Sequence, residues 1–134
     1  MKKAIIAIDQ GTSSSRAVLF DLDFSIIHIE QKEINTTYPK NGWVEQDANE
    51  IWNKTLSVTK NIISFAKEKY IKVISIGITN QRETIIAWNK ETGEPLYNAI
   101  IWQDRRTKDI CDNLIKNGLT KIINAKTGLL IDPY

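Results

Sequence analysis

Short apolar runs that alternate with polar turns open the chain. These runs cover Lys3 to Ile8, Arg16 to Leu22 and about Ser25 to Ile34. Apolar runs of this length, bounded by turn residues, are typical of buried strands. The sequence therefore predicts three consecutive strands, the first two of which form a β-hairpin around a polar turn.

The period of the hydrophobic pattern changes near residue 47. Asp47 is a suitable N-cap, and Glu50 follows it at the spacing of a capping box. Apolar side chains then recur at helical spacing and predict an amphipathic helix that ends at about Lys69. The predicted apolar stripe consists of Ile51, Trp52, Thr55, Leu56, Thr59, Ile62, Ile63, Ala66 and Tyr70.

The second half of the chain returns to short elements. The pattern predicts strands at Ile71 to Ile78, Thr84 to Trp88 and Tyr97 to Trp102, and a polar helix from about Arg105 to Lys116. Asn117-Gly118 is a helix-stop signal. Strands on both sides of an amphipathic helix indicate an α/β or α+β fold.

Composition excludes several classes of protein. A chain of 134 residues with 42% hydrophobic content is one modest globular domain or part of a larger one. A net charge of +2 is too balanced for a nucleic-acid or membrane surface, so we expect neither partner. No apolar run is long enough to span a membrane. Cys111 is alone, which excludes a disulfide framework and favours a reducing, cytoplasmic setting.

The first polar turn, residues 9–16, carries the most chemistry. Gly11 lets the backbone approach a ligand, and the hydroxyls of Thr12 to Ser15 can donate to phosphate oxygens. Asp9 could hold a hydrated Mg²⁺, and Arg16 adds positive charge. These residues predict a phosphate-binding loop for a nucleotide. An ordinary serine-rich hairpin turn is the alternative, and the residues alone leave both open.

Two further polar clusters follow predicted strands. In the second polar turn, residues 79–83, Glu83 could accept from substrate hydroxyls while Arg82 donates. A solvated hairpin with a local ion pair is the alternative. In the third cluster, residues 102–106, Trp102 could offer an apolar wall, or could be a core aromatic before a helix; Asp104 is assigned no role.

Taken together, these segments closely resemble glycerol kinases, which belong to the carbohydrate-kinase family with the actin-like, ribonuclease-H-like ATPase fold. The resemblance covers the whole chain, and the run Asn80 to Thr84 and the closing Asp132 to Tyr134 are its most specific parts. It implies an α/β fold: a ribonuclease-H-like mixed sheet with flanking helices, incomplete in this chain.

The resemblance also implies roles for single residues. ATP or ADP phosphates would be contacted by Thr12, Ser13, Ser14 and Arg16, and Asp9 would hold Mg²⁺ through water. Glycerol would be held by Arg82, Glu83, Trp102 and Tyr134. Ser13 stands where the family often has Thr, which keeps the hydroxyl.

The family's members are several times longer than this chain. Residues 1–134 would be the amino-terminal portion of the first actin-like domain; the second domain would be absent, and the general base would lie beyond the chain end. The implied function is ATP-dependent phosphorylation of glycerol to sn-glycerol 3-phosphate, with the isolated chain inactive and prone to self-association. The alternatives are a fragment of a related pentulose or gluconate kinase, and a non-catalytic remnant or binding module.

Overall fold

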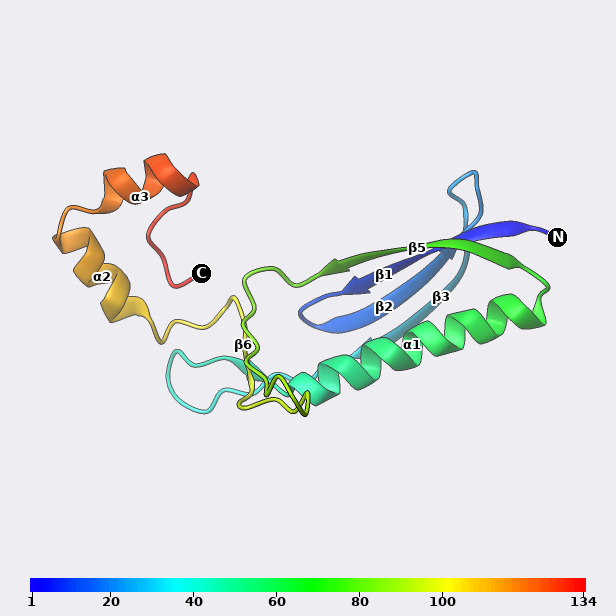
Figure 1. Cartoon of the computed structure of the whole chain (residues 1–134), viewed down its shortest axis with the longest axis horizontal. Helices are drawn as coiled ribbons and strands as arrows, with labels where there is room; N and C mark the ends of the chain where they lie inside the picture. Colours follow the sequence, from blue (N-terminus) through cyan, green and yellow to red (C-terminus); the bar gives the residue numbers. More distant parts are fainter.

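A four-stranded mixed sheet in the order β3-β2-β1-β5 organises the computed structural model, which describes residues 1–134 (Figure 1). Its strands are β1 (Lys3–Gln10), β2 (Ser14–Phe20), β3 (Ile26–Glu33) and β5 (Lys72–Asn80). The first three are antiparallel neighbours, and β5 pairs in parallel with β1. All four were predicted from the apolar runs, and the β1–β2 hairpin is confirmed.

The long helix α1 (Ala48–Glu68) connects the antiparallel strands to β5 and covers one face of the sheet (Figure 1). Its N-cap is confirmed, because the Asp47 carboxylate accepts from the Asn49 N–H at 2.8 Å. The capping box is wrong. Glu50 does not reach back to residue 47; its carboxylate instead accepts from the Asn35 N–H and side-chain amide.

The main core lies between α1 and the sheet. Alternate residues of β1 and β2 point toward the helix, as the period of a strand requires. The buried residues of this core are Ala4, Ile6, Ile8, Ala17, Leu19, Val58, Ile62 and Ala66.

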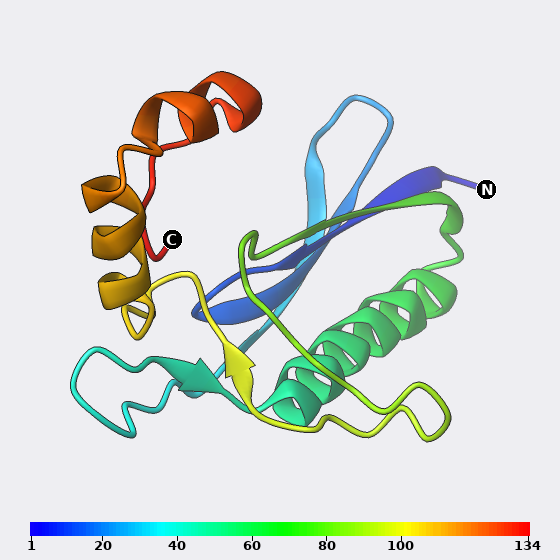
Figure 2. The same ribbon diagram turned by 60° about the vertical axis from the view of Figure 1, so that its left-hand side comes forward.

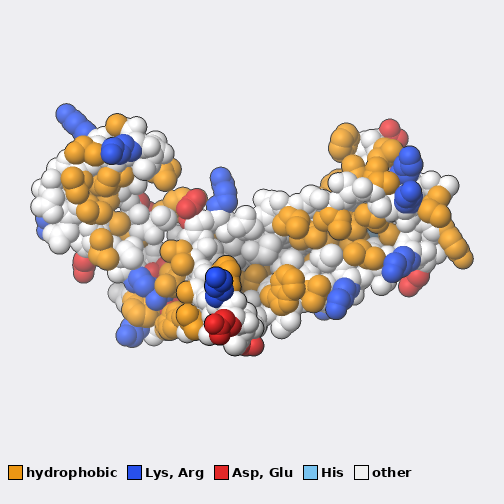
Figure 3. Space-filling view, in the orientation of Figure 1, with side chains coloured by type: hydrophobic (Ala, Val, Ile, Leu, Met, Phe, Trp, Pro, Cys, Tyr) orange, Lys and Arg blue, Asp and Glu red, His pale blue; other side chains and the backbone are white.

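The helix leaves the C-terminal half of β5 uncovered, and β5 forms one edge of the sheet. Ile76 and Ile78 are 47% and 75% exposed, and Trp52 on the facing side of α1 is 62% exposed. These three side chains line an apolar groove of about 560 Å³ between β5 and α1. Hydrophobic side chains are visible along this strip in Figure 3. The buried face of α1 is therefore narrower than the predicted stripe.

Short elements follow at the end of the sheet where β1 and β5 finish. The two-residue strands β4 (Glu45–Gln46) and β6 (Ala99–Ile100) pair with each other. The predicted strand at Thr84 to Trp88 is wrong, because that segment makes only isolated bridges, from Ile85 and Trp88. Of the strand predicted at Tyr97 to Trp102, only β6 forms, because its partner β4 is equally short.

Two helices complete the chain, and Figure 2 shows them beside the end of the sheet rather than on its face. The predicted helix is confirmed as α2 (Lys108–Lys116). α3 (Thr120–Thr127) was not predicted, because it has no side-chain N-cap and buries no residue. None of the helices is both long and apolar enough to cross a bilayer.

The exposed β5 edge predicts that the 134-residue chain self-associates. Unpaired N–H and C=O groups flanked by isoleucines are a template for pairing with a second copy. Ile78→Lys is expected to shift the sedimentation coefficient toward the monomer, since it places a charge on that edge. Phe24→Lys, which removes an exposed aromatic at the distant β2–β3 turn, is the control. Sedimentation of the unaltered chain as a monomer at every concentration would contradict the prediction.

Candidate functional site

The first polar turn is a tight hairpin connection between β1 and β2. The Gly11 N–H donates to the Ser14 carbonyl at 2.9 Å. A Cβ atom at residue 11 would lie 3.1 Å from that oxygen, so the close approach favours glycine. Asp9 and Arg16 are opposite each other across the two strands, and both are exposed. The turn therefore presents a carboxylate and a guanidinium side by side.

Ser15 does not belong to this polar surface, contrary to the sequence prediction. It is fully buried, and its hydroxyl lies 2.8 Å from that of Thr55 on α1. The Thr55 hydroxyl donates its own hydrogen to the Ile51 carbonyl, so Ser15 must donate to Thr55. Strand alternation explains the difference, because residue 15 faces α1 while its neighbours Ser14 and Arg16 face away.

Gln31 on β3 holds two of the predicted phosphate-binding residues and was missed by sequence reasoning. Its amide oxygen accepts from Arg16 Nε at 2.8 Å, and its amide nitrogen donates to the Ser14 hydroxyl at 3.1 Å. Because Ser14 accepts, its hydroxyl hydrogen remains free for a ligand oxygen. The terminal guanidinium nitrogens of Arg16 make no hydrogen bond within the chain.

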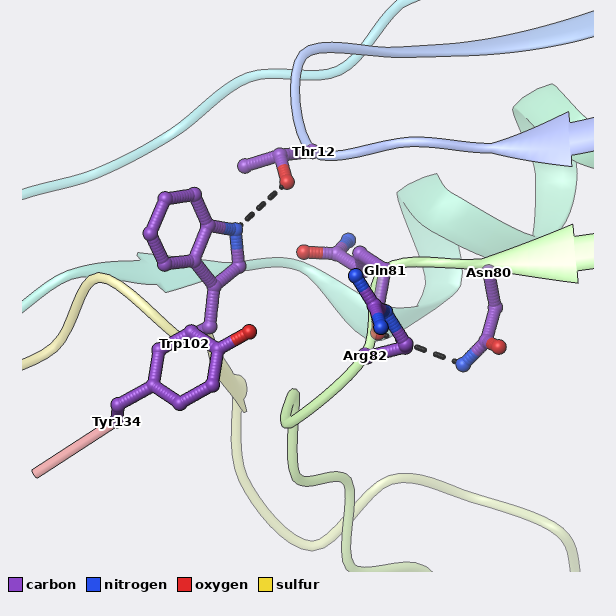
Figure 4. Close-up of a pocket in the computed structure, with 6 residues that line it drawn as sticks. All are labelled: Thr12, Asn80, Gln81, Arg82, Trp102 and Tyr134. Atoms are coloured by element: carbon purple, nitrogen blue, oxygen red, sulfur yellow. Dashed lines mark hydrogen bonds between the residues drawn. The ribbon is translucent and has the colours of Figure 1, made fainter. Parts of the chain in front are cut away.

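A pocket of about 330 Å³ lies beside this turn (Figure 4). It is lined by Thr12, Asn80, Gln81, Arg82, Trp102 and Tyr134. The Trp102 indole N–H donates to the Thr12 hydroxyl at 2.8 Å, and the Trp102 and Tyr134 rings pack edge to face at 5.8 Å. Figure 4 shows these aromatic rings on one side of the pocket and Arg82 on the other. The structure thus brings together four predicted residues, Thr12, Arg82, Trp102 and Tyr134, from four separate segments of the chain.

Glu83 does not line this pocket, although it was predicted beside Arg82. It is exposed and has a φ of +60°, in the left-handed region that few non-glycine residues occupy. Such conformations cluster at functional sites. The structure therefore leaves Glu83 next to the pocket, at the tip of the second polar turn. Ser13 is exposed at the first polar turn and also lies outside the pocket lining.

The first polar turn offers one carboxylate, that of Asp9, to a metal ion. No group of three or more His, Cys, Asp or Glu side chains forms a metal cage. Asp9 is exposed at the end of β1, with Oδ1 directed over Gly11. Mg²⁺ characteristically keeps its waters and takes one or two carboxylates plus phosphate oxygens. The residues present fit an ion of that kind, held by Asp9 and a bound phosphate.

A buried ionic cluster adjoins the segment that carries Trp102, and its members were not predicted. The Arg106 guanidinium donates to Glu45 at 2.7 Å and to Asp104 at 2.8 Å, and both carboxylates are at least 96% buried. Arg106 also stacks on Trp43, with its guanidinium carbon 3.8 Å from the ring centroid. The sequence offers no clear sign of this burial, because Glu45 is followed by two further polar residues, Gln46 and Asp47.

Hydrogen bonding lowers the pKa of both carboxyls. Burial by itself raises the pKa of Glu45, but donors on Asn98, Arg106 and Tyr97 more than offset it. For Asp104 burial is again opposed, by Arg106 and by the Val44 N–H. The same contacts, with Asp104 first, raise the pKa of Arg106. All three groups are therefore charged at neutral pH.

This cluster fixes where Trp102 lies. Asp104 accepts from the Val44 N–H at 2.7 Å, and the Val44 carbonyl accepts from the Ile101 N–H at 3.3 Å. These bonds hold the backbone on both sides of Trp102 against β4 and its flanking segment. The position of this pocket wall thus depends on the buried Asp104 carboxylate as well as on backbone pairing between Val44 and Ile101.

Comparisons with known proteins agree with this geometry. Residues 4–134 match the pattern of the FGGY family of carbohydrate kinases, N-terminal domain. The chain is 52% identical to the glycerol kinase of Geobacillus sp. (strain WCH70) over 134 residues, and 53% identical to that of Halalkalibacterium halodurans over 133 residues. It spans 27% of the length of each relative.

Solved structures show the same relationship. The crystal structure of Plasmodium falciparum glycerol kinase with ADP superposes with a TM-score of 0.92 at 36% identity, over 99% of this chain and 27% of that one. Gluconate kinase from Lactobacillus acidophilus superposes with a TM-score of 0.87 at 26% identity, over 99% of this chain and 26% of that one.

The chain belongs to the FGGY family of carbohydrate kinases, of which it matches the N-terminal domain. Within that family it is closely similar to glycerol kinases over its whole length. The predicted fold, a mixed α/β sheet with flanking helices of the actin-like ATPase type, is confirmed.

Removal of the buried cation is expected to destabilise the chain. Arg106→Met leaves Glu45 and Asp104 buried without their partner, and breaking a buried ion pair in this way costs about 3–5 kcal/mol. The free energy of unfolding, measured by urea titration, tests this. Arg105→Met is the matched control: its side chain is 50% exposed, so loss of its ion pair with Asp132 changes stability by about 1 kcal/mol or less. Equal losses for the two variants would contradict the assignment.

The same cluster predicts acid sensitivity. The pKa values of Glu45 and Asp104 are lower in the folded chain than in the unfolded one, so their contribution is complete above about pH 5 and disappears as pH falls through the folded values. The free energy of unfolding should therefore decrease between about pH 5 and pH 3. Asp104→Asn should show a shallower decrease, because one of the two shifted groups is gone. An identical pH dependence in both proteins would refute this.

Proposed function

We propose that the protein carrying this chain transfers the γ-phosphoryl group of ATP to glycerol and forms sn-glycerol 3-phosphate. The observation that carries the proposal is the pocket itself. Trp102 and Tyr134 supply apolar ring surface, and Arg82 and Thr12 supply donors on the opposite side and at the hairpin turn. A three-carbon polyol needs this combination, because its carbon chain is apolar and its hydroxyls are not.

The pocket and the first polar turn share one residue, Thr12, which would link the polyol to the phosphate. Thr12 lines the pocket and also belongs to the turn proposed to hold phosphate. Its hydroxyl accepts from Trp102, so its hydrogen is free to donate to an oxygen of either ligand. A phosphate at the turn would therefore lie beside a polyol in the pocket, as an in-line transfer requires.

Nucleotide and metal are assigned to the first polar turn. Ser13, Ser14 and Arg16 would donate to ATP or ADP phosphates, and Asp9 would hold Mg²⁺ through water. The ion would neutralise phosphate charge when bound. The chain's own residues bind and orient: Arg16 adds fixed positive charge, and Gly11 leaves room for phosphate oxygens.

In this proposed role the chain is the amino-terminal portion of the first domain of a longer enzyme. The general base toward the glycerol hydroxyl and the adenine pocket would lie outside residues 1–134. Identity to glycerol kinases over the full chain, at 27% of their length, supports this. We place the enzyme in the cytoplasm because Cys111 is a free thiol.

Expression of the complete reading frame that encodes this chain tests the proposal. A coupled ADP-release assay should show turnover with glycerol and much less with xylulose or gluconate, the rival substrate classes. The 134-residue chain alone should show none, since half a cleft cannot exclude water or align the reacting oxygens. Phosphorylation of a pentulose but not glycerol would overturn the substrate assignment. A stop codon followed by out-of-frame homologous sequence would indicate a non-catalytic remnant.

Arg82 provides the matched test within the pocket. Arg82→Met removes a charged donor, worth about 1.5–3 kcal/mol, so kcat/KM for glycerol should fall about 10- to 100-fold. Lys90→Met removes an exposed cation from a turn outside the pocket and should leave kcat/KM unchanged. A similar value for both variants would exclude Arg82 from glycerol binding.

A further inference from the structure

Two buried glutamines connect the first polar turn to the second. Gln46 on β4 is fully buried and Gln81, the residue after β5, is 7% exposed. Gln81 Nε2 donates to Gln46 Oε1 at 2.9 Å, and Gln46 Nε2 donates to the Thr12 carbonyl at 2.7 Å. Neither glutamine has been given a role above. Their amides form a continuous bridge between two loops that are far apart in the sequence.

The direction of the hydrogen bonds along this bridge is fixed at its Thr12 end. The Thr12 carbonyl can only accept, so the Gln46 amide must turn its nitrogen toward it. Gln46 then offers only its oxygen to Gln81, and the Gln81 oxygen in turn accepts from the Thr84 hydroxyl at 3.0 Å. Every hydrogen bond from residue 84 to residue 12 therefore points the same way. Hydrogen bonds in such a chain strengthen one another in a low-dielectric interior.

At its far end the bridge closes the second polar turn. Gln81 and Thr84 are joined through their side chains, and the two residues between them are Arg82 and the left-handed Glu83. A non-glycine residue at positive φ persists only where the surroundings hold it. The Gln81–Thr84 bond is the side-chain hydrogen bond that spans Arg82 and Glu83.

At its near end the bridge meets Thr12, which is also fixed through its side chain. Gln46 holds the carbonyl of Thr12, and Trp102 holds the hydroxyl. No buried side-chain polar atom of the chain lacks a partner, so loss of one member leaves another unpaired. A shift of Gln46 would therefore move Thr12, and through Thr12 it would move Trp102.

We propose that Gln46 and Gln81 are positioning residues that set the spacing between the phosphate-binding turn and the polyol-binding turn. Neither touches the reacting atoms. They act through Thr12 on one side and through Arg82 on the other. This inference rests on the proposed function, because it concerns the same site.

The indole N–H of Trp102 reports on the bridge without requiring activity. In the 134-residue chain, Gln81→Met should shift the Trp102 indole signal in ¹H–¹⁵N spectra and speed its hydrogen exchange about tenfold, because about 1.4 kcal/mol of protection is lost. Trp102→Phe assigns the signal. Gln81 makes no hydrogen bond with Trp102 itself, so a role confined to its own turn would leave the signal unmoved. Asn53→Met, which removes an exposed amide on α1, is the control.

A milder pair of variants guards against misfolding. Thr84→Val removes only the hydroxyl that donates to Gln81, and Thr84→Ser keeps it. Thr84→Val should displace the indole signal in the same direction as Gln81→Met, and Thr84→Ser should restore it. An indole signal at its unaltered position in Gln81→Met and Thr84→Val overturns the proposal.

Kinetics of the complete enzyme give the second measurement. A loss of spacing should lower kcat for glycerol about 10- to 100-fold in Gln81→Met and change KM much less, because alignment rather than binding is lost. A rise in KM at constant kcat would show that Gln81 only supports binding and would overturn the proposal. Absence of glycerol turnover in the unaltered enzyme would refute the proposed function instead, and the indole signal would still decide the role of the bridge.

Discussion

Parallel pairing of β1 with β5 is the constraint on which the site depends. The pairing sets Asp9 beside Thr79 and Gln10 beside Asn80, so both strands end at the same edge of the sheet. Parallel neighbours cannot be joined by a tight turn, and α1 supplies the crossover. The helix buries one face of the sheet while the polar turns that follow the two strands meet beyond its end. Trp102 and Tyr134 then complete the pocket around these turns.

In the region of β4 and β6, beyond the end of the sheet, polar contacts hold the backbone in place more than apolar packing does. The core under α1 contains eight buried hydrophobic residues, but the second cluster, near β4 and β6, contains only Ile34, Ile51 and Ala99. Here Arg106 with its two carboxylates, and Gln46 with Gln81, fix the backbone. A buried ion pair adds little net stability over apolar residues of the same size, and its members instead demand one geometry from their surroundings. A requirement for one geometry suits the pocket wall at Trp102, because the ring must lie at a defined distance from the ligand.

The sequence predicted what is local and periodic. Strands β1, β2, β3 and β5 and the helix α1 follow from apolar spacing, and the fold class follows with them. The residues Thr12, Arg82, Trp102 and Tyr134 were predicted from separate motifs, and only the structure shows that they line one pocket. Reasoning failed where a partner far along the chain decides the outcome. The segment Thr84 to Trp88 has no continuous strand to pair with. The Ser15 hydroxyl hydrogen-bonds to Thr55, and Gln46 hydrogen-bonds to Gln81, which lies 35 residues further along the chain. α3 buries nothing, so no periodic stripe marks it.

The long reach of the Trp102–Thr12 bond has a consequence for the order of folding. The β1–β2–β3 hairpins pair neighbours in the sequence, whereas this bond joins residues 90 apart. Loops that span more residues close later, because more chain entropy is lost before the contact forms. We therefore expect the first polar turn to exist early, attached to a growing sheet, and the pocket to appear only when α1 has delivered β5 to its edge. The phosphate-binding turn would then form before the polyol pocket each time the chain folds.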